Sequence, residues 1–144
     1  MSLLACDVGT VRIGVARSAG SLAMPLDAIP AGDASFAGVA DLVSELAVTC
    51  VYVGLPLRLA GDEGPAALMA REWAKLLATH INVPVRLVDE RLSTAQAQRG
   101  FHEAGRSTKQ SRSRIDSASA VVILQAVLDW APDSEPGEPV GGES

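Results

Sequence analysis

The chain has 144 residues, of which 48% are apolar and 20% are charged, and this composition is typical of one globular domain. No apolar run approaches the roughly 20 residues of a membrane span, and the first ten residues lack the basic flank of a secretion signal. We therefore expect a cytoplasmic protein that does not bind a membrane.

Three apolar segments at the start of the chain predict three antiparallel strands. The first two, residues 3–8 and 11–17, are joined by a tight turn at Gly9 and Thr10. The third, residues 21–30, contains two prolines, which lack the amide hydrogen that a central strand requires. We therefore expect the third strand to lie at an edge of the sheet or to contain a bulge.

The chain then alternates between predicted helices and strands. Further strands are expected at residues 50–56 and 83–89, and helices at about 35–47, 65–80, from 95 onwards and 114–131. An antiparallel meander followed by strand–helix alternation predicts an α/β fold, with a five-stranded mixed sheet and helices on both faces.

The end of the sequence differs in composition from the rest. Residues 132–144, PDSEPGEPVGGES, contain four acidic and no basic residues, and they are predicted to form a disordered acidic tail. Residues 1–131 are predicted to form the single domain, and they carry 12 basic and 13 acidic residues. Because this domain is nearly neutral, the net charge of −5 does not exclude a nucleic-acid partner.

Three carboxylates lie where predicted elements begin or end. Asp7 is near the end of the first strand, Glu90 directly follows the fifth, and Asp116 is expected in the first turn of the last helix. Ligands of open sheets with helical crossovers bind beyond the carboxyl ends of the strands, so the three can converge there. Each also has an ordinary explanation, as a turn cap, as the partner of a neighbouring arginine, or as a favourable charge at a helix N-terminus.

Converging carboxylates repel one another unless cations lie between them, and oxygen ligands suit Mg²⁺ or Mn²⁺. Two such ions can activate a water molecule and stabilise the leaving oxygen of a phosphodiester. The sequence therefore predicts a metal-dependent nuclease, with Asp7, Glu90 and Asp116 as catalytic residues and metal ligands. Whether the adjacent Asp89 is also a ligand is left open.

Four segments resemble the bacterial YqgF/RuvX family: CDVGTVRIGVA (6–16), VGLP (53–56), VDERLSTAQA (88–97) and IDSASAVVILQ (115–125). The resemblance implies a ribonuclease H-type fold and places the family's catalytic acids on Asp7, Glu90 and Asp116. It also implies nuclease activity, either in maturing the 5′ end of 16S ribosomal RNA or in resolving Holliday junctions. The loop after GLP departs from the family pattern, because it reads LRLAGDEG.

Several residues around the carboxylates are predicted to bind substrate. The segment from residue 99 to 114 has a local charge of +4, which would attract a phosphate backbone, and glycine or hydroxyl side chains at turns can approach a phosphate closely. The candidates are Gly9, Thr10, Arg12, Arg91, Ser93, Thr94, Arg106, Lys109 and Arg112. The expected partner is structured RNA or branched DNA, and the sequence leaves open whether the chain forms a homodimer.

Two other classes of function remain as alternatives. A non-catalytic factor that binds ribosomal RNA would use the basic segment alone. A nucleotide-binding protein of the actin type is suggested by DVGT followed by Gly14, but such proteins need two lobes and a longer chain.

Overall fold

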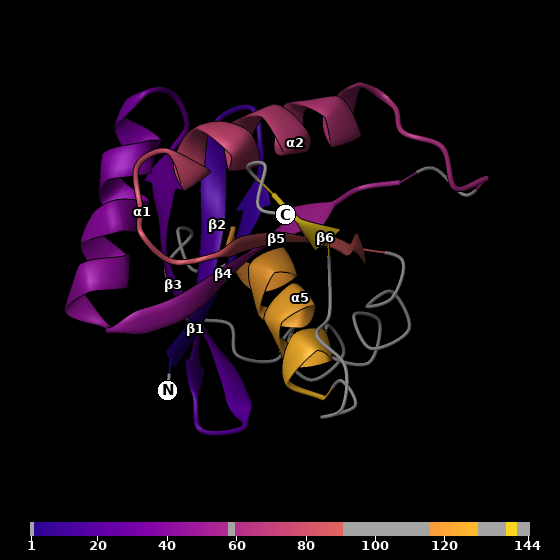
Figure 1. Ribbon diagram of the computed structural model, residues 1–144. Coiled ribbons are helices and arrows are strands. Elements are labelled where there is room, and N and C mark those ends of the chain that lie inside the picture. Colours follow the sequence, from indigo (N-terminus) through magenta and orange to yellow (C-terminus); the bar gives the residue numbers. More distant parts are fainter. Residues whose placement is uncertain (1, 58–59, 91–115, 130–137, 141–144) are drawn as a thin grey trace.

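The computed structural model describes residues 2–57, 60–90, 116–129 and 138–140 (Figure 1). The elements are β1 (Ser2–Val8), β2 (Arg12–Ala19), β3 (Leu22–Pro30), α1 (Ala34–Glu45), β4 (Val48–Leu55), α2 (Pro65–Ala78), β5 (Val85–Asp89), α5 (Ala118–Leu128) and β6 (Glu138–Pro139). None of the helices described is long and apolar enough to cross a membrane.

The strands form one mixed sheet in the order β3-β2-β1-β4-β5-β6. The pairs β1–β4 and β4–β5 are parallel, and the other pairs are antiparallel. The predicted five-stranded mixed sheet is therefore confirmed, with the short β6 added at its edge. The strand with two prolines, β3, lies at the opposite edge, and its register with β2 shifts between Ile13 and Val15. The prolines predicted an edge position or a bulge, and both are present.

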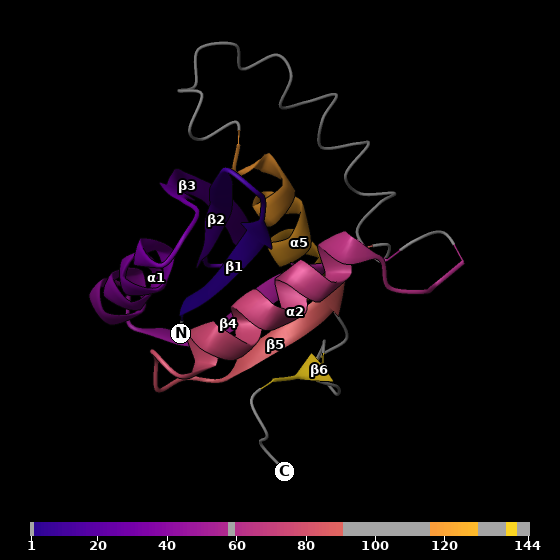
Figure 2. The ribbon, with the colours of Figure 1, turned by 90° about the horizontal axis from the view of Figure 1, so that it is seen from above.

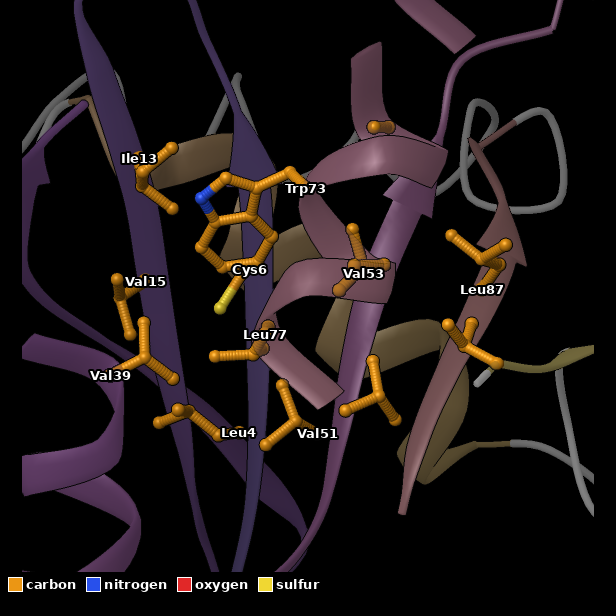
Figure 3. Close-up of a cluster of buried hydrophobic side chains, with 14 of the residues drawn as sticks. Leu4, Cys6, Ile13, Val15, Val39, Val51, Val53, Trp73, Leu77 and Leu87 are labelled. Atoms are coloured by element: carbon orange, nitrogen blue, oxygen red, sulfur yellow. The ribbon is translucent and has the colours of Figure 1, made fainter. Parts of the chain in front are cut away.

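Helices cover both faces of the sheet, as predicted (Figures 1 and 2). On one face, α1 and α2 pack on a core that includes Leu4, Cys6, Val39 and Leu77 (Figure 3). On the other face, α5 packs on a second, smaller core. Side chains alternate between the faces along each strand, so Leu4 and Cys6 of β1 face α1 and α2, whereas Ala5 faces α5.

The last helix begins later than predicted. The sequence predicted a helix over about 114–131 with Asp116 in its first turn, but α5 begins at Ala118 and Asp116 lies in the turn before it. The physical reason is that the hydroxyl of Ser117 bonds to backbone groups of Val15 and Leu26, which fixes this residue against the sheet. The helix predicted from residue 95 lies outside the described residues.

Part of the predicted disordered tail is ordered. Residues 138 and 139 pair with β5, and the amide of Val140 donates a hydrogen bond of 3.0 Å to the carbonyl of Val85. The side chain of Val140 is buried in the core beneath α2. Burial of this apolar side chain favours the ordered state of the segment, although the residues around it are mostly polar. The remainder of residues 132–144 lies outside the described residues.

Candidate active site

Asp7 and Glu90 lie on the α5 face of the sheet. Asp7 is two residues after Ala5 on β1, and Glu90 is two residues after Val88 of β5; Ala5 and Val88 both pack against α5. Because β1, β4 and β5 are parallel, their carboxyl ends meet at one edge. The alternation of side chains therefore gathers both carboxylates beside the N-terminal half of α5.

Gly54 provides the space between the two acidic strands. It lies on β4, which runs between β1 and β5, one residue beyond the pair Cys6↔Val53. A Cβ at this position would stand 2.7 Å from Oε2 of Glu90 and 2.5 Å from Cδ1 of Ile123 on α5. Any larger residue would displace the carboxylate or the helix. The glycine thus allows Glu90 to fold back over β4.

The carboxylate of Asp7 is partly withdrawn from water. Burial raises its pKa, and a hydrogen bond with the side chain of Ser119, in the first turn of α5, acts in the opposite direction. The hydrogen bond stabilises the charged form that burial disfavours. Ser119 is therefore a residue of α5 that contacts Asp7 on β1 directly, through this hydrogen bond.

The carboxyl of Glu90 has a strongly raised pKa. Burial, followed by the negative charges of Asp7 and Asp89, raises its pKa from 4.5 to about 7. The contribution from Asp7 shows that the two carboxylates are close enough to repel each other. A raised carboxyl pKa caused by burial and a second carboxylate is typical of functional sites.

Asp116 lies in the turn before α5, packed on the strand that pairs with β1. The backbone of this turn lies directly over Gly14, whose hypothetical Cβ would be 2.5 Å from the carbonyl oxygen of Asp116. Gly14 in turn pairs with Asp7 across the β1–β2 ladder. The structure thus brings Asp116 next to the strand segment that carries Asp7.

One carboxylate oxygen of Asp116 is buried and lacks a hydrogen-bond donor among the described residues. This oxygen, Oδ2, lies 3.3 Å from Nη1 of Arg12. Within the described part of the chain this buried oxygen nevertheless accepts no hydrogen bond. A buried carboxylate oxygen without a hydrogen-bond donor is unfavourable, so an additional positive group at this point would stabilise the site.

The turn between β1 and β2 lies at the same end of the sheet. The amide of Gly9 donates a 3.0 Å hydrogen bond to the carbonyl of Arg12, and a Cβ on Gly9 would be 2.6 Å from that oxygen. Thr10 is exposed, and the side chain of Arg12 is 49% exposed. Of the predicted substrate-binding residues, these three are described. The others, namely Arg91, Ser93, Thr94, Arg106, Lys109 and Arg112, lie outside the described residues.

The three candidate ligands are of a chemical type that suits a hard divalent cation. Asp7, Glu90 and Asp116 supply only carboxylate oxygens, which Mg²⁺ and Mn²⁺ prefer. The repulsion between Asp7 and Glu90 and the orphaned oxygen of Asp116 are both features that a cation would relieve. Among the residues that the structure describes, however, no three such side chains converge closely enough to form a metal-binding group.

A cavity of about 430 Å³ lies elsewhere, and its lining includes Leu68, Lys75, Leu87 and Val140. It is on the α2 face of the sheet, because Leu87 and Val140 belong to the core beneath α2. Asp7 and Glu90 are on the opposite face. The cavity therefore does not belong to the carboxylate site.

Sequence reasoning did not assign three residues to the carboxylate site that shape it: Gly14, Gly54 and Ser119. The two glycines had a detectable signal, because an isolated glycine inside an apolar strand marks close approach of another group. Ser119 had no such signal, because a serine in the first turn of a helix is ordinary. Its contact with Asp7 arises only from the packing of α5 on β1.

Residues 1–130 match the profile of a family described as RuvX: Holliday junction resolvase. Relatives carrying the name "Putative pre-16S rRNA nuclease" include one from Kineococcus radiotolerans, 46% identical over 96% of this chain and 78% of its own length. Another, from Leifsonia xyli, is 43% identical over 95% of this chain and 92% of its own length.

Among solved structures, Thermus thermophilus RuvC in complex with a Holliday junction substrate aligns with a TM-score of 0.68 and 14% identity, covering 97% of this chain and 99% of that one. A second RuvC structure from this organism aligns with a TM-score of 0.61 and 16% identity, covering 97% and 100%. At these identities the likeness concerns the fold alone, and it confirms the predicted ribonuclease H-type architecture. The sequence match over residues 1–130 and the relatives above 40% identity show that the chain belongs to the RuvX family of nucleases.

Proposed function

We propose that the protein is a metal-dependent endonuclease that processes the 5′ end of pre-16S ribosomal RNA. The observation that supports this most strongly is the placement of Asp7 and Glu90 on one face, with Gly54 between their strands and a pKa of about 7 at Glu90. The names of the curated relatives support RNA as the substrate.

Asp7, Glu90 and Asp116 are the residues that would hold the cation. We propose that two ions bind, either Mg²⁺ or Mn²⁺. Bound there, they would activate a water molecule and stabilise the leaving oxygen. The charge of the site changes with proton binding at Glu90, because a carboxyl with a pKa of about 7 exchanges its proton near neutral pH.

The neighbouring side chains orient these acids and bind the substrate. The hydrogen bond with Ser119 limits the rotation of the Asp7 carboxylate and favours its charged form. Arg12 lies beside Asp116 and is half exposed, so its guanidinium is placed to donate hydrogen bonds to a phosphate oxygen. Gly9 and Thr10 extend this surface along the β1–β2 turn. The remaining substrate-binding residues stay predictions from the sequence.

The test is a cleavage assay with two substrates and two variants. A pre-16S RNA with an extended 5′ end and a four-way DNA junction are incubated with Mg²⁺ or Mn²⁺. Asp7→Asn should lose at least about 100-fold in rate, because a metal-ligating charge is removed. Asp41→Asn, which removes an exposed aspartate from α1, should cleave like the wild type.

Cleavage of the RNA, but not of the junction, is the expected result. Efficient cleavage of the junction would instead support the resolvase activity that the family description names. Equal cleavage by the wild type and Asp7→Asn would refute the proposed site. A wild type that binds the RNA without cleaving it would support a non-catalytic role.

A further inference from the structure

The pairing between β2 and β3 contains a gap that a side chain from another element fills. Ile13 pairs with Ile29, but Val15 pairs with Leu26, so β3 has one more residue than β2 in this interval. Such a bulge disturbs the regular ladder of backbone hydrogen bonds. The groups left next to it require other partners.

Ser117 supplies both partners. Its hydroxyl accepts a hydrogen bond of 2.9 Å from the amide of Val15 and donates one of 2.7 Å to the carbonyl of Leu26. The residue is completely buried. The hydroxyl thus links two strands to the start of α5, across more than 90 residues of sequence.

A second constraint acts on the same turn from below. Because Gly14 has no side chain, the carbonyl oxygen of Asp116 can sit where a Cβ would be only 2.5 Å away, and the Cα of Ser117 only 3.1 Å. Gly14 allows the turn to approach β2, and the Ser117 hydroxyl holds it there. Asp116, the residue next to Ser117, is therefore fixed against the strand that pairs with Asp7.

We propose that Ser117 is a positioning residue, whose two hydrogen bonds hold the turn that carries Asp116 over Gly14, the partner of Asp7, and so orient the Asp116 carboxylate for the reaction. The inference rests on the proposed function, in which Asp116 holds a metal ion. Without the hydroxyl, the Val15 amide and the Leu26 carbonyl lose their shared partner and the turn is free to shift. The Asp116 carboxylate then loses the position that this turn gives it.

The chain offers a matched control at the other end of the same helix. Gln125 accepts a hydrogen bond of 2.9 Å from the amide of Ala23 and donates one of 3.0 Å to the carbonyl of Ser21. It therefore attaches α5 to the same hairpin as Ser117 does, but two helical turns away from Asp116. Gln125→Ala should loosen the helix without displacing that acid.

The experiment measures Mn²⁺ binding by electron paramagnetic resonance, together with the Mg²⁺ dependence of cleavage. Ser117→Ala should weaken Mn²⁺ binding by about 10-fold, the effect typical of losing a group that orients a ligand. Its cleavage should recover as the Mg²⁺ concentration is raised. Gln125→Ala should bind Mn²⁺ like the wild type, even where its melting temperature falls as far as that of Ser117→Ala.

Asp116→Asn separates this inference from the proposed function. If Asp116→Asn cleaves and binds Mn²⁺ like the wild type, the role of Asp116 itself is refuted, and this inference with it. If Asp116→Asn is inactive while Ser117→Ala matches Gln125→Ala in Mn²⁺ affinity, only the positioning role of Ser117 is refuted. Should Ser117→Ala fail to fold, Ser117→Cys fills the same buried space with weaker hydrogen bonds, and wild-type Mn²⁺ affinity in it would overturn the proposal.

Discussion

Glu90→Gln tests the electrostatics of the site without any substrate. The raised pKa of Glu90 means that the folded protein favours the neutral carboxyl. Its contribution to stability is therefore fully present below pH 4.5, declines as the pH rises, and is lost above the folded-state pKa of about 7. Glutamine stays neutral throughout this range, so the variant should not show this decline.

The magnitude follows from the shift. A change in pKa from 4.5 to about 7 corresponds to at most about 3 kcal/mol of unfolding free energy. Because the carboxyl is partly exposed, solvent screening reduces the expected effect to about 1–2 kcal/mol. The difference in unfolding free energy between Glu90→Gln and the wild type should grow by this amount between pH 4.5 and 7.5.

The assay is urea unfolding followed by tryptophan fluorescence, in the presence of a chelator, at several pH values. Glu72→Gln, on the exposed face of α2, serves as the control and should run parallel to the wild type. Asp7→Asn should lower the pKa of Glu90 only in part, since burial is the larger cause of the shift. Parallel curves for Glu90→Gln and the wild type would refute the reasoning.

Three further substitutions test other parts of the structure. Gly54→Ala should lower stability by about 1–3 kcal/mol and abolish cleavage, because its methyl group would overlap Ile123 and the Glu90 carboxylate; chemical denaturation and the RNA assay measure the two effects. Ser119→Ala should raise the pKa of Asp7 further, because a hydrogen bond to its charged form is lost; carboxyl carbon chemical shifts in an NMR titration measure this. Val140→Ala should lower the unfolding free energy by about 1 kcal/mol, since it removes buried methyl groups; the same denaturation assay measures it.

Each has a clear contrary result. Normal cleavage by Gly54→Ala would show that the spacing between the acidic strands is not critical. An unchanged pKa of Asp7 in Ser119→Ala would show that Ser119 does not stabilise the Asp7 carboxylate. Unchanged stability of Val140→Ala would mean that the tail residue contributes nothing to the core in solution.

Local patterns in the sequence were sufficient to predict the sheet and the two acids at its edge. Alternating apolar residues predicted the strands, and the position of a carboxylate after an apolar run predicted Asp7 and Glu90. The two prolines in β3 predicted an edge position or a bulge, because each removes a backbone donor, and the structure has both. All of these signals lie within a few residues of the feature that they predict.

The features that were missed depend on contacts between distant parts of the chain. Helix α5 starts at Ala118 because Ser117 is hydrogen-bonded to Val15 and Leu26. These partners are 102 and 91 residues away in the sequence, so a local pattern cannot reveal the contact. The β6 pairing lies beside one buried valine in a segment that is rich in proline and acidic residues. In both places a tertiary contact prevailed over local propensity.

The long separation between Ser117 and its partners also has a consequence during synthesis. The ribosome delivers β1, β2 and β3 first, whereas the turn that carries Asp116 is made about 90 residues after Leu26. The strands that carry Asp7 and its partner Gly14 can form early, but the proposed site lacks Asp116 until α5 has left the ribosome and docked. If Asp116 acts as proposed, the chain gains nuclease activity only after its last helix has emerged from the ribosome.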